Sequence, residues 1–262
     1  MKLTIIGAGN MGGATALGLV RAARLQAADI TMADRNEETL SKFSAAGFQT
    51  STDNTSAISG ADVIILAVKP FLAKLVIDGI RPALRPEQTL VSFAAGISGE
   101  SLKEWLDDGN GKLVCRALFL AIPNIAIELC QGMTFICPVI ATQEDTDKVL
   151  SLFDGTGTSM IVNEKNLSAG MALSSCGIAY AMRYIRAAAE GGVEMGFYPA
   201  QAVEIVCQTV QGAAALISEH KSNPEAEIDK VTTPGGFTIR GLNAMEAAGF
   251  TAAVQSGLKA GK

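Results

Sequence analysis

Residues 1–12 read Met-Lys-Leu-Thr-Ile-Ile-Gly-Ala-Gly-Asn-Met-Gly, and this stretch decides the fold. It starts with Lys2–Ile6, a short apolar run with branched residues that is typical of a buried strand. Gly7, Gly9 and Gly12 follow with the spacing G-x-G-x-x-G, at which a strand turns into a helix around a dinucleotide pyrophosphate. The first glycine permits the tight bend, the second lets the pyrophosphate approach the backbone, and the third lets the helix pack closely. The alternative is a glycine-rich turn that binds nothing.

The composition limits the class of protein. A chain of 262 residues can form one large domain or two small ones, and we expect two. Hydrophobic residues make up 48% of the chain and aromatic residues only 5%, so aliphatic side chains form the core and the excess suggests buried subunit contacts. The apolar segments are interrupted well short of about 18 residues, so no membrane span is expected. With a net charge of −5 and no basic cluster, the chain is not expected to bind nucleic acid.

The cysteines and the single histidine argue against several kinds of site. The five cysteines are scattered, without C-x-x-C spacing and without a secretory segment before them. We therefore expect reduced thiols and a cytoplasmic location. His220 lies in a polar stretch without a metal-ligand partner, so we expect a solvated side chain and no metal site. A Ser-His-Asp hydrolase would need a better-placed imidazole.

Strand and helix patterns alternate over the first part of the chain. This alternation predicts an α/β domain with a doubly wound, mostly parallel sheet. Residues 53–60 read as a polar connection. The expected strands cover residues 2–6, 30–33, 48–50, 61–68, 88–93, 112–118 and 134–137, and the expected helices cover residues 10–25, 37–46, 71–84, 99–106 and 142–153.

The pattern changes beyond residue 162, where we expect helices only. They cover residues 165–190, a segment from Pro199 to about His220, a short helix from Pro224, and residues 238–259. A helix that is apolar on most sides is buried, and a helical tail hides such surface best by pairing with a second copy. We therefore expect a dinucleotide-binding domain over residues 1–162 and an all-α dimerisation domain over residues 163–262.

Ligands of a doubly wound sheet bind outside the carboxyl ends of its strands. This rule selects the glycine turn, the pair Lys69-Pro70, the small residues Ala94–Gly96 and the pair Pro123-Asn124. Small residues would let a flat nicotinamide lie against the backbone, although tight packing of a helix on a strand would also explain them.

The residues Asp34, Arg35 and Asn36, which directly follow the second expected strand, give conflicting indications about the cofactor. Asp34 would accept from the free 2′-hydroxyl of NAD, whereas Arg35 and Asn36 could hold the 2′-phosphate of NADP. The three residues could also simply polarise a strand-to-helix turn.

A second glycine-rich turn, residues 232–238, reads Thr-Thr-Pro-Gly-Gly-Phe-Thr and lies between two helical segments. Consecutive backbone N–H groups in such a turn suit an anion such as a carboxylate. The alternative is a turn that only separates two helices, with Thr238 as N-cap of the last helix. The two interpretations are compatible, because an N-cap can also present donors to a ligand.

Taken together, these stretches resemble the pyrroline-5-carboxylate reductase family, in order and over nearly the whole chain. The resemblance implies a Rossmann domain followed by a helical domain that interlocks with its partner's, so that two chains build each active site. It also implies reduction of Δ1-pyrroline-5-carboxylate to proline with NADPH or NADH, and we expect NADPH to be preferred. The matching stretches are residues 7–12, 67–70, 92–97, 123–124, 172–174, 177–180 and 231–239.

The resemblance also implies roles for individual residues. The segment from Val231 to Thr238 would hold the substrate carboxylate, with Thr238 bonding the ring nitrogen as the catalytic residue, and Asn54 would lie near the adenosine ribose. The implied substrate-binding residues are Val231, Thr233, Gly235, Gly236 and Thr238. The implied cofactor-binding residues are Gly7, Gly9, Asn10, Met11, Gly12, Asp34, Arg35, Asn36, Asn54, Ala67, Val68, Lys69, Pro70, Ala95, Gly96 and Asn124.

Two stretches depart from the family pattern. Between Arg116 and Pro123 the chain has about four residues more than the family, so an apolar insertion is expected beside the nicotinamide site. Cys176 and Ile178 replace a serine and a proline of the family.

Two other functions remain as alternatives. A related dehydrogenase of β-hydroxy acids would need a lysine on the long helix, which offers only Lys165 at its start. A dinucleotide-binding sensor would bind cofactor without reducing pyrroline-5-carboxylate.

Overall fold

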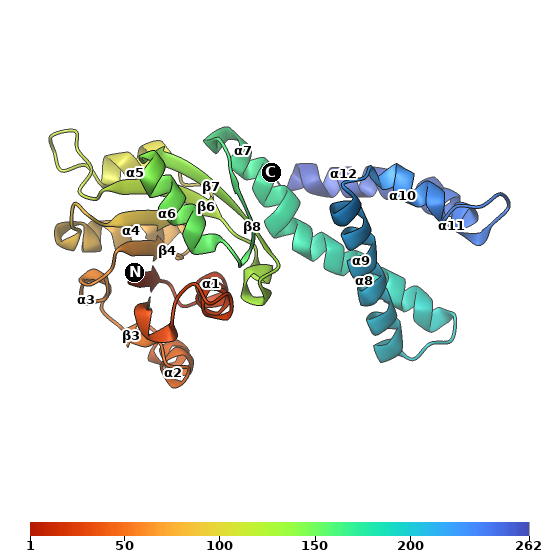
Figure 1. The fold of residues 1–262 in the computed structure, drawn as a ribbon, viewed down its shortest axis with the longest axis horizontal. Coiled ribbons are helices and arrows are strands. Elements are labelled where there is room, and N and C mark those ends of the chain that lie inside the picture. Colours follow the sequence, from red (N-terminus) through yellow and green to blue (C-terminus); the bar gives the residue numbers. More distant parts are fainter. Residues whose placement is uncertain (262) are drawn as a thin grey trace. The chain divides into compact units, whose positions relative to one another are not determined.

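The computed structural model describes residues 1–261, which form two compact units (Figure 1). The first unit is Met1–Ser175, and the second begins at Cys176. The expected boundary between residues 162 and 163 stays a prediction. Each unit is described by itself below.

An eight-stranded sheet forms the centre of the first unit, with the strand order β3-β2-β1-β4-β5-β6-β7-β8. Neighbouring strands are parallel except β6 and β7. The strand order reverses beside β1 and β4, which is where such sheets bind dinucleotides. The predicted doubly wound, mostly parallel sheet is therefore confirmed. The strands are β1 (Leu3–Ile6), β2 (Ile30–Ala33), β3 (Gln49–Ser51), β4 (Val63–Leu66), β5 (Thr89–Ser92), β6 (Ala117–Ile122), β7 (Gly132–Ile140) and β8 (Gly157–Ile161).

Helices cover both faces of this sheet, because its central strands are apolar on both sides. In β4, Val63 and Ile65 belong to one core with residues of α1, α2 and α6, whereas Ile64 and Leu66 belong to a second core with residues of α3, α4 and α5. This follows from the two-residue period of a strand. The helices are α1 (Asn10–Arg21), α2 (Glu37–Ala45), α3 (Asn54–Ile58), α4 (Pro70–Ile80), α5 (Gly99–Trp105), α6 (Gln143–Phe153) and α7 (Glu164–Gly170), with 3-10 turns at η1 (Ala27–Asp29), η2 (Arg81–Ala83) and η3 (Ile125–Leu129).

Several expected elements of the first unit were wrong. The expected polar connection contains α3, a short helix that Asp53 caps by accepting from the backbone N–H of Thr55. The expected strand 112–118 is instead β6, which begins at Ala117, because residues 107–113 form a glycine-containing turn closed by Asp107 and Leu113. The edge strand β8 was not predicted.

Over the described residues 176–261, the second unit contains helices and no strand. Its helices are α8 (Gly177–Glu194), α9 (Pro199–His220), α10 (Pro224–Lys230), α11 (Phe237–Ala247) and α12 (Phe250–Ala260). The expected helix 238–259 is two helices, because Gly249 between them adopts a φ of +87°. The expected helix 165–190 is interrupted as well, by the π-helical turn η4 (Met171–Cys176) that follows α7.

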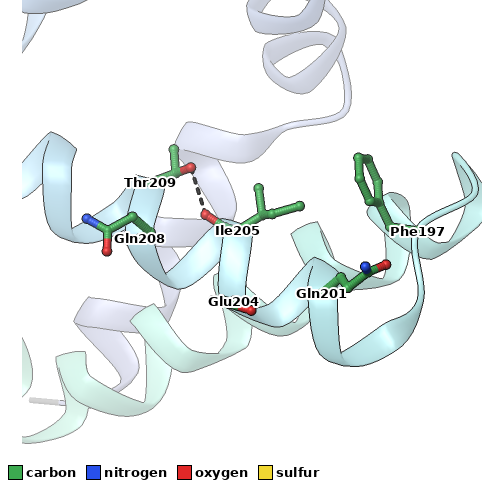
Figure 2. A pocket seen from close by; sticks show the side chains of 6 residues that line it. All are labelled: Phe197, Gln201, Glu204, Ile205, Gln208 and Thr209. Atoms are coloured by element: carbon green, nitrogen blue, oxygen red, sulfur yellow. Dashed lines mark hydrogen bonds between the residues drawn. The ribbon is translucent and has the colours of Figure 1, made fainter.

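The long helix α9 is largely exposed within this chain, and Ala202 is its only buried residue. Among the described residues it is the one helix that is long and apolar enough to cross a membrane by length and composition alone. The expectation that the chain has no membrane span stays a prediction. Figure 2 shows a hollow on this helix with Phe197, Gln201 and Ile205 on its wall. No predicted site residue lies there.

Candidate active site

A cleft of about 610 Å³ opens in the first unit, within the size range of small-molecule sites. Ten residues that the sequence predicts to bind the cofactor line it, namely Gly7, Gly9, Asn10, Met11, Asp34, Ala67, Val68, Lys69, Pro70 and Ala95. Six further lining residues were not assigned to the cofactor site, namely Leu72, Phe93, Ile122, Pro123, Met171 and Ser175.

The parallel strands bring these residues together by ending at the same level. The backbone N–H of Gly7 donates to Ala33 O at 2.7 Å. Similarly, the N–H of Ala67 donates to Ile6 O at 2.8 Å. The ladder of hydrogen bonds thus continues past the ends of the strands, and the turns that follow share one edge of the sheet.

Glycine stands at the three positions of the first turn for different physical reasons. Gly7 adopts a φ of +104°, and a Cβ at Gly12 would lie 1.9 Å from Gly7 O, so the packing of the chain itself requires both. Gly9 has an ordinary φ of −71°, and a Cβ there would meet nothing within 4 Å. Gly9 instead leaves open space in the cleft, which fits the close approach of a pyrophosphate to the backbone.

The N-terminus of α1 adds hydrogen-bond donors at the same place. Gly9 is the N-cap residue and supplies no side chain, and the first turn contains no acidic residue. The first N–H groups of this 12-residue helix therefore have no side-chain acceptor from the cap. Together with the positive end of the helix dipole, they suit a bound phosphate.

At the adenosine end, Asp34 has a defined orientation. One carboxylate oxygen of Asp34 accepts from the backbone N–H of Ala8 at 2.9 Å, and the other accepts from the N–H of Asn36 at 3.0 Å. The side-chain oxygen of Asn36 accepts from the N–H groups of Glu38 and Thr39 and so caps α2. Of the residues with conflicting cues, only Asp34 lines the cleft.

Six predicted cofactor residues do not line the cleft. They are Gly12, Arg35, Asn36, Asn54, Gly96 and Asn124. Gly12 lies against the carbonyl of Gly7, and Arg35 and Asn36 are exposed at the start of α2. Asn124 is 5% exposed, and its side chain contacts the backbone of Met133 and Ser174.

Arg116 lies at the amino end of β6, the opposite end of the strand from the cleft. Its guanidinium forms ion pairs with Glu144, at 3.2 Å, and with Asp145, whose side chain is 3% exposed. From Ala117 onward β6 pairs with β5 in regular register. Of the residues between Arg116 and Pro123, Ile122 lines the cleft, and the expected effect of the insertion on the nicotinamide site stays a prediction.

The second glycine-rich turn belongs to the second unit and is exposed. Gly235 has a φ of +73°, and a Cβ at Gly236 would lie 2.6 Å from the hydroxyl of Thr233. The N-cap of α11 is Gly236, so the alternative with Thr238 as N-cap was wrong. The side chains of Val231 and Thr238 are exposed.

One residue that contacts this turn, Arg240 of α11, was not singled out from the sequence. The guanidinium of Arg240 lies 4.7 Å from the ring centre of Phe237, and its Nε donates to Gly236 O at 3.4 Å. A lone arginine one turn into a helix carries no motif, so only the structure could reveal that it contacts the turn.

All five cysteines are free thiols, and burial raises the pKa of Cys115 to about 12, so this thiol is inert at neutral pH. Among residues 1–261 no cluster of three or more His, Cys, Asp or Glu side chains could hold a metal ion.

Two family models match the chain. Residues 164–262 match pyrroline-5-carboxylate reductase dimerisation, which supports the expected self-association. Residues 2–96 match the family model described as "NADP oxidoreductase coenzyme F420-dependent". The two matches follow each other along the chain, as the glycine turn and the helical region do.

Curated proteins and a solved structure resemble the chain along its whole length. Pyrroline-5-carboxylate reductase 1 of Dictyostelium discoideum is 35% identical over 98% of this chain, which spans 48% of that protein. Pyrroline-5-carboxylate reductase of Methanosarcina acetivorans is 34% identical over 96% of this chain and 92% of that protein. The crystal structure of Plasmodium falciparum pyrroline carboxylate reductase with NADP bound has the same fold, with a TM-score of 0.87, 24% identity, and coverage of 100% of this chain and 95% of that chain.

These matches agree with the resemblance read from the sequence motifs. At 34% identity with a relative that is covered almost completely, the chain belongs to the pyrroline-5-carboxylate reductase family.

Proposed function

We propose that this protein reduces Δ1-pyrroline-5-carboxylate to L-proline, with NADPH as preferred cofactor and NADH accepted. The observation that carries the proposal is the cleft at Gly9, where the backbone leaves space and free N–H donors for a pyrophosphate. Family membership supports the reaction, and the match of residues 2–96 to an NADP oxidoreductase model supports the cofactor.

The first unit holds and orients the dinucleotide in this proposal. The N–H groups at the start of α1 bind the pyrophosphate, and the carboxylate of Asp34 accepts from the 3′-hydroxyl of the adenosine ribose, which is free in both NADPH and NADH. When bound, the reduced nicotinamide supplies the hydride. The apolar side chains of Phe93, Ile122 and Met171 keep water from that end of the cleft.

The substrate needs little activation, because a protonated cyclic imine is already electrophilic. The N–H of Gly236 donates to Thr233 O, so the backbone N–H groups that follow it at the start of α11 would bind the substrate carboxylate. The hydroxyl of Thr238 would donate to or accept from the ring nitrogen and so fix the imine carbon in position. Most of the rate enhancement would come from holding the imine carbon against C4 of the reduced nicotinamide.

We further propose that the protein works as a homodimer or an assembly of dimers in the cytoplasm, without membrane or nucleic-acid partners. The apolar surface of α9 lies in the region that matches a dimerisation model. We therefore propose that a second copy of the chain buries this surface, and that a membrane does not. The net charge of −5 supports the absence of nucleic acid.

The test is oxidation of NADPH by the purified protein with Δ1-pyrroline-5-carboxylate, with proline identified by mass spectrometry. Turnover with NADH in place of NADPH gives the cofactor preference, and light scattering gives the number of subunits. Tight binding of NADPH without turnover would favour the sensor. Turnover of β-hydroxy acids instead would favour the related dehydrogenase, although α8 contains no lysine that could serve as its acid or base.

A further inference from the structure

Ser175 is a lining residue of the cleft to which neither the motifs nor the comparisons assign a role. It lies in the π-helical turn η4, far along the chain from the glycine turn. Its hydroxyl is 3.0 Å from the backbone oxygen of Pro123, a residue 52 positions earlier that also lines the cleft. Single π-helical turns often mark functional sites, and here the turn brings a polar group to the cleft.

The surroundings of Ser175 belong to the nicotinamide half of the cleft. Asp34 follows β2, on one side of β1, and the adenosine lies on that side in the proposed function. Pro123 follows β6, on the other side of β1, where the nicotinamide lies in the proposed function. The other lining side chains there, those of Phe93, Ile122 and Met171, are apolar.

The hydrogen bond to Pro123 fixes the chemistry of the hydroxyl. A carbonyl oxygen has no proton, so Ser175 must be the donor in this contact. A serine hydroxyl has one proton and two lone pairs, so the Oγ of Ser175 can then only accept from a ligand. The nicotinamide ring carries a carboxamide whose NH₂ group is a donor.

Hydrogen bonds of Asn124 hold the segment around Ser175 in place. The buried side chain of Asn124 donates to the backbone oxygen of Ser174 at 3.5 Å and accepts from the N–H of Met133 at 3.4 Å. These contacts connect η4 to the sheet, so Ser175 keeps its orientation before a ligand arrives. A preoriented acceptor loses little entropy on binding.

We propose that Ser175 binds the carboxamide NH₂ group of the nicotinamide and so selects cofactors that carry this group. This inference rests on the proposed function, because it requires a nicotinamide dinucleotide in the cleft. Ser175 is a cofactor-binding and orienting residue, and the substrate carboxylate and ring nitrogen are bound elsewhere.

The test compares NADP⁺ with its 3-acetylpyridine analogue, in which a methyl group replaces the NH₂ group. Calorimetric dissociation constants are measured for the wild-type protein and for Ser175→Ala, Ser175→Thr and Ser168→Ala. The wild-type protein should bind NADP⁺ roughly threefold to tenfold more tightly than the analogue, as for one hydrogen bond. Ser175→Ala should lose this preference by weakening NADP⁺ alone, and Ser175→Thr should restore it.

Ser168→Ala is the matched control, because Ser168 lies on α7 in the preceding turns and does not line the cleft. It should keep the preference. Equal weakening of NADP⁺ and analogue by Ser175→Ala would show a merely structural role and overturn the inference, while leaving the proposed function intact. Failure of the wild-type protein to bind NADP⁺ at all would overturn the proposed function and this inference with it.

Discussion

The two glycine-rich turns of this protein differ in how much of their structure the chain itself supplies. The turn at Gly7–Gly12 is built into the sheet, and the chain's own backbone dictates two of its three glycines. The turn at Thr232–Thr238 is exposed, with Phe237 87% accessible within this chain. The comparison teaches that the proposed cofactor site is preformed in one unit, whereas the proposed substrate turn is exposed within this chain. The following predictions test this difference, from the largest expected effect to the smallest.

Gly12→Ala should have the largest effect, because its Cβ would lie 1.9 Å from Gly7 O and the backbone would have to move. We expect a loss of about 3 kcal/mol or more in the free energy of unfolding, measured by urea denaturation followed by circular dichroism. Gly241→Ala is the control, since a Cβ there would meet nothing within 4 Å. Wild-type stability of Gly12→Ala would contradict the described packing of the first turn.

Gly9→Ala should separate binding from folding in the same turn. The new methyl group would enter open space, and φ is already suitable, so stability should be unchanged or higher by up to about 1 kcal/mol. The affinity for NADP⁺ should fall at least about tenfold, because the methyl group occupies the space of the pyrophosphate and blocks its hydrogen bonds. Calorimetry checks the affinity. Undiminished affinity would mean that the pyrophosphate does not approach Gly9.

Thr238→Ala should change catalysis without changing folding, because the side chain is exposed. We expect kcat/KM for pyrroline-5-carboxylate to fall by an amount equivalent to roughly 1–3 kcal/mol of transition-state stabilisation. Steady-state kinetics measure this effect, and the dissociation constant of NADP⁺ serves as control and should stay constant. An unchanged kcat/KM would remove Thr238 from the proposed mechanism.

Glu227→Gln should have the smallest effect, on the helix α10 that leads into the second turn. Hydrogen bonding to Lys230, whose Nζ lies 2.8 Å from the carboxylate, and then to Ser222 and His220 lowers the pKa of Glu227 to about 2. A lowered pKa means that this carboxylate stabilises the fold above its unfolded pKa of 4.5 and loses that contribution as the pH falls toward 2.

The variant should therefore melt slightly below the wild-type protein at pH 7, and the difference in Tm should vanish as the pH falls toward 2. Thermal melting over this pH range measures it. A difference that persists at the lowest pH would assign the effect to packing instead of charge.

How far the sequence predicted the fold differs between elements. The strand Ile30–Ala33 was located correctly, because a polar residue and a helix start follow it directly. β6 was placed too early, since residues 112–122 are apolar enough for a strand in more than one position. Only the pairing of Ala117 with Thr89 on β5 selects the actual one.

The same holds for the candidate site. Gly7, Gly9 and Asp34 were predicted correctly as residues of one cleft, because their spacing reports a local strand-turn-helix geometry. Asn124 was predicted to bind the cofactor, and its side chain contacts the backbone of Ser174 and Met133. The direction in which a side chain points at the end of a strand depends on what packs behind it, and a motif does not contain this information.

The sequence by itself determined the class of the fold, the position of the dinucleotide turn and the family. These features depend on the spacing of glycines and on short apolar periods, which are local properties of the chain. Only the tertiary structure decided that Gly9 has no internal reason to be glycine and that Ser175 reaches the cleft beside Pro123. Both facts depend on contacts between distant segments, which form only when the sheet is assembled.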